Sequence, residues 1–332
     1  MIVKGILKII LFYLSILVIG VSCQKSEDPL SNSQKEDYWE IISDINEGFN
    51  NIFFIDAKNG WAVGDTGKIK YTNDGGKTWL NQNSETNNTL ISVYFINNYK
   101  GFAAGYNKTL IYTENGGSTW KGYEIKSGSA TIYGSLHSDI SDNIYLISNY
   151  GEILYSPDAG QTWNYKYKFS DWGYSYLFYP NNSTGFAMKF LGSELQKTTD
   201  GGINWITYQL PSPWTGDIFF LNDSYGWVSE NWGPSSTIHD SVSFYFTSNG
   251  GENWTLLSKL SGISLDKIVF TSIDVGWVTQ VTKIYYTNNG GKSWVCQFDN
   301  ENIGYIREIY FLNNSCGWAL TSQGKIIKYS SN

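Results

Sequence analysis

The chain has 332 residues, of which 17% are aromatic, and a formal net charge of −7. An acidic chain whose single arginine is Arg307 lacks the clustered positive charge of a nucleic-acid-binding surface. A sialidase-like site is excluded too, because several arginines must grip the substrate carboxylate bidentately and lysine does not replace them.

Residues 1–22 have the pattern of an export signal. Lys4 and Lys8 precede an apolar run of residues 9–21, which is too short and wrongly flanked for a stable transmembrane anchor. Ser22 and Cys23 then resemble a bacterial lipobox, although Gly20 stands where leucine is usual. This resemblance implies a lipid on Cys23 that tethers the protein to a membrane. We therefore expect a lipoprotein of a Gram-negative cell envelope, at the outer membrane and facing the periplasm or the surface.

Residues 23–37 are polar, with one proline, and are predicted to form a flexible tether. Lys25, Glu27 and Asp28 lie close behind the cysteine and resemble the charged surface-export signals of some outer-membrane lipoproteins. A plain solvated linker explains the same residues equally well.

From residue 38 onward, six copies of one turn motif organise the chain. In the first copy, TNDGGKTW, Asp74 can accept hydrogen bonds from nearby backbone amides, the glycines supply positive φ, and Trp79 can pack between sheets. A structural role is therefore predicted for the acid or amide of each copy. Steps of 41, 43, 42, 49 and 40 residues separate these positions, which are Asp74, Asn115, Asp158, Asp200, Asn249 and Asn289. A repeat of this length predicts stacked supersecondary units.

Each repeat carries three short apolar or β-branched runs before the motif and one after it, which predicts four strands. Four strands per repeat of about forty residues predict an all-β, seven-bladed β-propeller over residues 38–332. A glycine followed by Trp or Phe opens the second strand of each blade except the third, which has Asn143, Ile144 and Tyr145. The seventh repeat has no outer strand of its own, so the strand that begins near Tyr38 and Trp39 is predicted to close the ring.

The repeats resemble those of the Asp-box, or BNR, proteins, and the pairing of GWAVG with TNDGGKTW resembles the photosystem II assembly factor branch. The resemblance covers about residues 38–332 and implies the propeller fold. Activity does not follow from it, because sialidases, sortilin-type receptors, xyloglucan-cleaving hydrolases and assembly factors share the repeat.

The order of turns sorts residues by face. In a four-stranded meander the first and third turns share one face, while the second turns and the interblade links share the other. The motifs, hereafter boxes, are third turns. Three tryptophans outside the repeat pattern all fall on the opposite face: Trp172, Trp214 and Trp232. Together with Asp171, Tyr174, Asp217 and Glu230 they are the candidate ligand-binding residues. The alternative is that long loops fold over their own indoles.

Two functions are open. The first is a non-catalytic binding or assembly module, expected to be monomeric, for a protein or an envelope complex. The second is a surface glycan-binding or glycoside-hydrolase-like lipoprotein that uses the same aromatic face. Hydrolysis needs two carboxylates about 5 to 10 Å apart, and Asp171, Asp217 and Glu230 are the candidates without a supporting motif. We expect no enzymatic activity.

No cofactor or metal is expected. His137 and His239 are predicted on opposite faces, which argues against a zinc or histidine-based site. The boxes lack the run of oxygen ligands that an EF-type calcium loop requires. Cys296 and Cys316 lie in adjacent blades, and both a disulfide between them and two buried thiols are open.

Overall fold

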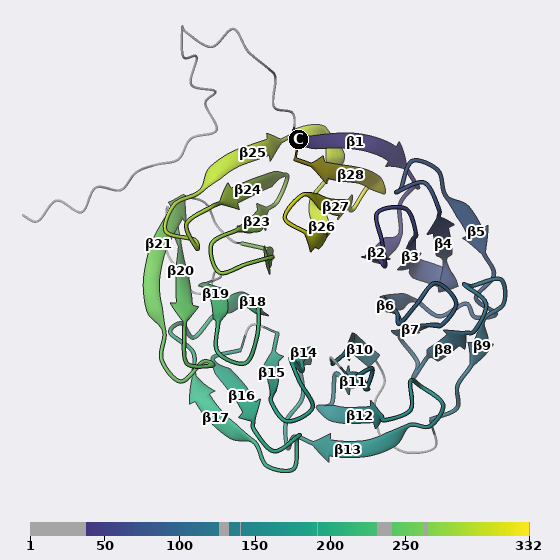
Figure 1. The fold of residues 1–332 in the computed structure, drawn as a ribbon, viewed down its shortest axis with the longest axis horizontal. Coiled ribbons are helices and arrows are strands. Elements are labelled where there is room, and N and C mark those ends of the chain that lie inside the picture. The colour runs from purple at the N-terminus through teal and green to yellow at the C-terminus, as the bar shows by residue number, and fades with distance from the viewer. Residues whose placement is uncertain are drawn as a thin grey trace, which may run out of the picture.

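Seven four-stranded antiparallel sheets stand around a central axis in the computed structural model (Figure 1), which describes residues 38–125, 133–139, 141–190, 192–230, 241–261 and 265–331. The only helical elements in these ranges are two short 3-10 turns, η1 (Asp65–Gly67) and η2 (Glu301–Ile303). Nowhere in the same ranges is there a helix of the length and apolarity that spanning a membrane requires. The structure confirms the predicted all-β, seven-bladed propeller. The predicted export signal and tether, with Cys23, lie outside the described residues.

Six blades follow the chain from the inner to the outer strand. Blades 1 to 3 consist of β2 (Phe49–Phe54), β3 (Gly60–Gly64), β4 (Ile69–Thr72) and β5 (Leu80–Gln82); β6 (Leu90–Phe95), β7 (Gly101–Gly105), β8 (Leu110–Thr113) and β9 (Lys121–Gly122); and β10 (Tyr133–Ser138), β11 (Ile144–Ser148), β12 (Glu152–Ser156) and β13 (Asn164–Lys168). Blades 4 to 6 consist of β14 (Tyr174–Phe178), β15 (Gly185–Lys189), β16 (Glu194–Thr198) and β17 (Ile206–Gln209); β18 (Thr215–Phe220), β19 (Gly226–Glu230), β20 (Ser241–Thr247) and β21 (Thr255–Ser261); and β22 (Lys267–Phe270), β23 (Gly276–Gln280), β24 (Lys283–Thr287) and β25 (Val295–Asp299).

Blade 7 joins the two ends of the propeller. It contains β26 (Ile306–Asn313), β27 (Cys316–Thr321) and β28 (Lys325–Ser330), and its outer strand is β1 (Trp39–Asp44). β1 pairs antiparallel with β28, with Trp39 opposite Tyr329. The Trp39 indole donates to Gln297 Oε1 of the preceding blade at 3.2 Å, as the box residue Trp120 donates to Gln82 Oε1 at 3.2 Å. The predicted closure is confirmed, with Trp39 in the place of a box tryptophan.

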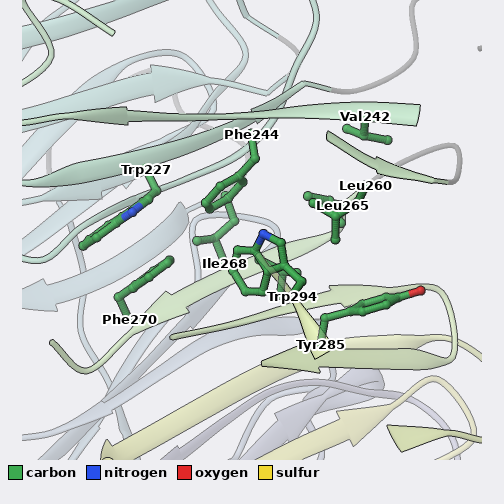
Figure 2. Packing of buried hydrophobic residues seen from close by; sticks show 10 residues of the cluster. Trp227, Val242, Phe244, Leu260, Leu265, Ile268, Phe270, Tyr285 and Trp294 are labelled. Carbon is green, nitrogen blue, oxygen red and sulfur yellow. The ribbon is translucent and has the colours of Figure 1, made fainter. Parts of the chain in front are cut away.

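Stacked aromatic rings fill the seams between blades. A ring at or just after the end of one inner strand lies flat against a ring from the second strand of the preceding blade, as Figure 2 shows for Trp227 and Phe270. Centroid separations run from 3.5 Å for Trp61 and Phe95 to 3.9 Å for Tyr145 and Tyr179. Such pairs contribute about 0.5 to 1.5 kcal/mol each beyond the area they bury. The seam between blades 2 and 3 differs, because the residue at the inner-strand end there is Ser138.

The same rings explain the glycines that open each second strand. A Cβ on Gly60 would lie 2.5 Å from the Phe54 ring, and the equivalent glycines of five other blades meet a ring at 2.4 to 2.6 Å. In blade 3, Ser138 is paired directly with Ile144. Because Ser138 leaves space that a phenyl ring would fill, a side chain as large as isoleucine fits opposite it. The exception in the sequence pattern is therefore a volume exchange across one strand pair.

Each box is a hydrogen-bonded turn that uses its side chains. In the first box, Asp74 Oδ1 accepts from the amides of Lys77 and Thr78 at 2.9 Å, and Asp74 Oδ2 accepts from the Thr78 hydroxyl at 2.6 Å. The Thr72 hydroxyl accepts from the amide of Gly76 at 2.9 Å. Both Gly75 and Gly76 have positive φ, a conformation that glycine adopts without strain.

The boxes also join neighbouring blades. The indole of Trp318 donates to the Gly75 carbonyl of the next blade at 2.9 Å, and Trp227 donates to the Gly290 carbonyl at 3.0 Å. Blade 7 has no box, and Trp277 of blade 6 instead donates to Gln297 Oε1 at 3.2 Å. The boxes of blades 1 and 6 thus support a seam as well as a turn.

Cys296 and Cys316 do not form a disulfide with each other. Cys316 is a half-buried free thiol that packs in the seam of blades 7 and 1, beside a core that includes Trp318. Cys296 packs beside the core of blades 5 and 6, which includes Trp294. The two residues therefore lie in different interblade cores. Burial raises the pKa of the Cys316 thiol.

Candidate binding face

The face opposite the boxes is formed by the second turns and the interblade links, as the strand order requires. Asp171 and Trp172 lie there, in the link between blades 3 and 4. The link is fixed on both sides, because Gly173 donates to the Asn149 carbonyl of blade 3 at 2.6 Å and its own carbonyl accepts from Phe190 of blade 4 at 2.9 Å. Asn149 and Phe190 both belong to second turns.

Trp172 projects from this fixed link with 72% of its side chain exposed. Beside it, Asp171 accepts from Lys189 Nζ at 2.5 Å and from the Trp172 amide at 2.8 Å. The bond from Lys189, followed by that from the amide, holds the pKa of Asp171 below its usual range. The carboxylate is therefore ionised and paired at neutral pH, and it fixes the backbone that carries the exposed indole.

Three further aromatic residues, which were not predicted from the sequence as ligand-binding residues, lie on the same face. Tyr106, Tyr150 and Phe190 each follow the second strand of blades 2, 3 and 4, and they are 44%, 40% and 67% exposed. Together with Trp172 they form what we call the aromatic arc. The signal was present in the sequence as an aromatic residue directly after the second strand in blades 2 and 4 and one residue later in blade 3.

The turns do not need these rings. The amides of Tyr106 and Phe190 donate to the carbonyls that precede their inner strands, both at 2.9 Å. In blades 1 and 7, Asp65 and Ser322 make the same backbone bond, at 2.7 and 2.8 Å. Because only the backbone is used, the side chain at this position is free to vary from blade to blade.

A cavity of about 600 Å³ opens beside Asp171 at the edge of blades 3 and 4. Its lining combines aromatic and charged side chains, among them Phe169, Asp171, Tyr174, Lys189, Glu194 and Trp205. Lys168, which also lines it, pairs with Glu152 at 3.2 Å. A ligand here would meet both signs of charge and flat apolar surface.

The structure places Tyr174 in the core instead of on the surface. Its side chain is 5% exposed and stacks on Phe169 with a centroid separation of 4.3 Å. Lys189 Nζ lies 5.7 Å from the centre of the ring. Burial raises the pKa of the Tyr174 hydroxyl. Tyr174 can therefore support the cavity wall but presents little surface.

Trp214 and Glu230 meet at Ser212, in the link between blades 4 and 5. The Ser212 hydroxyl lies 3.1 Å from the Trp214 carbonyl and 3.5 Å from Glu230 Oε1, and the Trp214 amide donates to it at 3.2 Å. Both Trp214 and Glu230 are half-buried. This pair shares no contact with the group around Asp171 among the described residues. Trp232 and His239 lie outside those residues.

Asp217 belongs to the inner strands and not to the surface patch. Its Oδ2 accepts from the Ile268 amide of the next blade at 2.8 Å. Burial raises the pKa of Asp217 to about 6, although Lys267 opposes this effect. Lys267 in turn pairs with Glu308 of blade 7 at 3.2 Å. These inner-strand groups stabilise contacts between adjacent blades.

Arg307 also joins blades. Its Nη1 donates to the Phe49 carbonyl at 3.1 Å and to Asn50 Oδ1 at 2.5 Å, both in blade 1, and its Nη2 donates to the Tyr305 hydroxyl at 2.7 Å. His137 Nε2 lies 3.0 Å from the Tyr179 carbonyl. Across the described ranges, no group of three or more His, Cys, Asp or Glu side chains is arranged to hold a metal.

The box carboxylates have low pKa values. At Asp74 and Asp158, partial burial favours the neutral acid and alone would raise the pKa. Hydrogen bonds outweigh this effect and lower both pKa values to about 2, and the strongest of them come from Thr78 to Asp74 and from Thr162 to Asp158. At Asp200, the amide and side chain of Asn204 are the main cause of a pKa of about 2. In the box of Asn115, the amide oxygen accepts from the Thr119 amide at 2.9 Å without any titrating group.

Comparison with known proteins agrees with this architecture. Residues 31–170 match the family model described as photosynthesis system II assembly factor YCF48. No curated protein matches the sequence.

Several solved structures share the fold. A structure titled "YCF48 bound to D1 peptide" is 20% identical with a TM-score of 0.73, over 90% of this chain and 99% of that one. YCF48 from Cyanidioschyzon merolae is 16% identical with a TM-score of 0.72, over 88% and 98%. A catalytically inactive virginiamycin B lyase from Staphylococcus aureus, with quinupristin, is 13% identical with a TM-score of 0.70, over 89% and 100%. At these identities the structures establish the fold alone. The chain is therefore a seven-bladed β-propeller whose residues 31–170 are similar to the photosystem II assembly factor family of BNR propellers.

Proposed function

We propose that this chain is a non-catalytic, membrane-tethered propeller that binds a protein partner through the aromatic arc. The observation that carries the proposal is the exposure of rings that the fold does not use. Phe190 and Tyr106 make the same backbone bond as Ser322 and Asp65, so their side chains serve no purpose in the turn. Aromatic residues dominate the binding energy of protein interfaces when they become buried against a partner.

A protein partner fits the surroundings of the arc. The neighbouring cavity of about 600 Å³ offers Lys168, Lys189, Asp171 and Glu194 beside aromatic rings. A peptide segment can present backbone amides, charges of both signs and an apolar side chain to such a surface. The similar propeller YCF48, which was solved with a D1 peptide bound, supports a peptide-binding role for this class of ring.

The arrangement of carboxylates supports a role without chemistry. Asp171 is bonded to Lys189, Glu230 meets Ser212, and Asp217 accepts from an amide in the inner strands. These three groups lie in different local networks. A hydrolase would hold two of them across one sugar-binding cleft.

The anchor and the location are part of the proposal. Lipid on Cys23, followed by the tether to residue 37, would hold the ring at the outer membrane of a Gram-negative cell. The described chain begins at Tyr38, whose carbonyl accepts from the Ser330 amide at 3.0 Å, at the end of β28. That end of β28 lies on the box side. The tether thus joins the ring on the side away from the arc, which leaves the arc free to meet a partner.

Site-specific photocrosslinking in the native envelope tests the binding face. A photoreactive residue placed at position 172 or 190 is expected to give the same discrete crosslinked protein. The matched control is position 203 on the box side, because Ile203 is equally exposed at 74%. Equal crosslinking from position 203, or none from 172 and 190, would contradict the proposed face.

A triple variant, Tyr150→Ala, Trp172→Ala and Phe190→Ala, tests whether the rings supply the affinity. It is expected to abolish the crosslinked product from position 106 while its thermal midpoint stays unchanged. If the triple variant instead loses binding to polysaccharide and the crosslinked protein persists, the arc is a glycan-binding surface.

The anchor is tested separately. The Cys23→Ala variant is expected to leave the membrane fraction and to lose incorporation of an alkyne-labelled fatty acid. Retention in the membrane with unchanged labelling would refute lipidation at Cys23. This result would leave the crosslinking experiment intact, since that experiment reports only on the ring.

A further inference from the structure

A groove on the box side, between the outer strand of blade 1 and the box turn of blade 2, has an unusual lining. Its volume is about 620 Å³, and none of its lining residues carries a formal charge. Side-chain amides and tyrosines predominate in the lining, which includes Tyr71, Leu80, Asn81, Gln82, Tyr99 and Asn115. This groove lies on the face opposite the aromatic arc.

The Tyr99 side chain is exposed in this groove, and the conformation of the turn does not require it. Its ring is 70% exposed. The turn uses only the backbone of Tyr99, whose carbonyl accepts from the Gly116 amide of the box at 2.8 Å and whose amide donates to Asn97 Oδ1 at 2.9 Å. The same backbone bond to a box glycine is made in four other blades by residues without an aromatic ring, namely Lys58, Ser183, Ser224 and Asp274. The ring at position 99 is therefore additional to the repeat.

The amides of the groove are held in place before any ligand arrives. Gln82 donates through Nε2 to the Gly116 carbonyl at 2.8 Å, and its Oε1 accepts from the Trp120 indole at 3.2 Å. Asn81 accepts through Oδ1 from Lys70 Nζ at 2.9 Å, which directs its amide nitrogen to other acceptors. Leu80, between the box tryptophan and Asn81, is 64% exposed. A fixed donor beside exposed apolar surface reduces the ordering cost of binding.

From this combination we propose that the groove binds a neutral oligosaccharide. One sugar ring lies flat on Tyr99, where its apolar C–H face contacts the aromatic ring. Its hydroxyl groups, which both donate and accept, pair with the amide of Asn81 and with neighbouring amide and backbone groups. The lining carries no formal charge, and the neighbouring Lys70 ammonium is already bonded to Asn81 Oδ1, so a uronate, a phosphate or a charged peptide side chain gains little to offset its burial and is disfavoured.

Calorimetry on the purified full-length chain in detergent tests the groove with defined probes. The neutral probes are cellohexaose, xylohexaose, mannohexaose and maltohexaose, and the charged probe is hexagalacturonate. At least one neutral hexaose is expected to bind, and Tyr99→Ala is expected to weaken that binding about tenfold, the equivalent of losing one good aromatic contact. Tyr99→Phe keeps the ring and is expected to retain the affinity. Unchanged thermal midpoints show that both variants fold.

The outcomes separate this site from the arc. Trp172→Ala lies on the other face and is expected to leave oligosaccharide binding unchanged. The proposal is overturned if no neutral hexaose binds, if hexagalacturonate binds more tightly, or if Trp172→Ala abolishes binding while Tyr99→Ala does not. Failure here has no bearing on protein binding by the arc, which the crosslinking from positions 172 and 190 measures.

Discussion

The boxes and the second turns connect the strands of the same blades, yet they constrain the sequence in opposite ways. A box uses its side chains to hold the turn, as Asp74 does by accepting hydrogen bonds from two amides and a hydroxyl. A second turn needs only a backbone bond, which Phe190 and Ser322 make equally well. Repetition in the sequence therefore marks structural side chains, and variation at a fixed backbone bond marks positions where function can be added.

The largest expected effect on stability concerns neither the boxes nor the second turns but the closure of the propeller by β1. Deletion of residues 38–45 removes β1 and Trp39 and leaves β28 as an unpaired edge. Loss of one buried tryptophan alone costs about 3 to 5 kcal/mol, so thermal unfolding should shift strongly or the chain should fail to fold. An unchanged melting curve would show that closure contributes nothing to stability.

Ser138→Phe tests a site in the strands, where packing constrains the sequence and the Ser138 hydroxyl also bonds the Tyr94 hydroxyl at 2.6 Å. The new ring would meet Ile144, which is paired with it and fully buried, and overpacking of this kind costs about 1 to 3 kcal/mol. Adding Ile144→Gly recreates the pair found in the other blades and should recover most of the loss. A double-mutant cycle from chemical denaturation measures the coupling, and additive effects would contradict the volume exchange.

Substitution within a box should cost more than substitution in a second turn. Asp74→Ala leaves the amides of Lys77 and Thr78 without their acceptor, which should cost about 1 to 3 kcal/mol. Asp74→Asn should cost less, since Asn115 and Asn289 fill the same position in other boxes. Denaturant unfolding of the two variants is the measurement, and equal losses would refute the hydrogen-bond explanation.

Acid should distinguish the boxes that hold aspartate. The pKa of Asp74, Asp158 and Asp200 is lowered to about 2 from an ordinary value of 3.8. Their contribution is therefore complete above about pH 4 and is lost as the pH falls from about 4 to about 2. A variant with all three changed to asparagine should lose less stability over that interval. If the thermal midpoints of the two proteins fall by the same amount between pH 4 and pH 2, the aspartates do not make this contribution to stability.

The smallest effect is expected at the second turns. Phe190→Ala keeps the backbone bond to Gly173, and its ring is already two-thirds exposed, so the free energy of unfolding should change by about 0.5 kcal/mol or less. Chemical denaturation checks this. A loss as large as that of Asp74→Ala would mean that the aromatic arc is structural and would remove the main support for its role in binding.

The sequence predicted the fold almost completely, because boxes and the Gly-Trp pattern report directly on repeated contacts. It also located the exposed Trp172 and the closing strand at Trp39. It could not predict that Tyr174 is buried on Phe169, since an aromatic residue beside a link reads the same whether its ring turns inward or outward. Asp217 was misplaced for a similar reason, because its inner-strand environment depends on Ile268 of another blade.

The pairing of β1 with β28 also sets the order in which the molecule can be assembled. Trp39 must meet Tyr329, although nearly the whole propeller lies between them in the chain. Contacts so distant in sequence form slowly, because closing the intervening chain costs conformational entropy before the contact contributes any favourable energy. Until they form, β28 stays unpaired, and its open edge can pair with other chains. We therefore expect the joining of β1 to β28 to be a late step in the folding of this propeller.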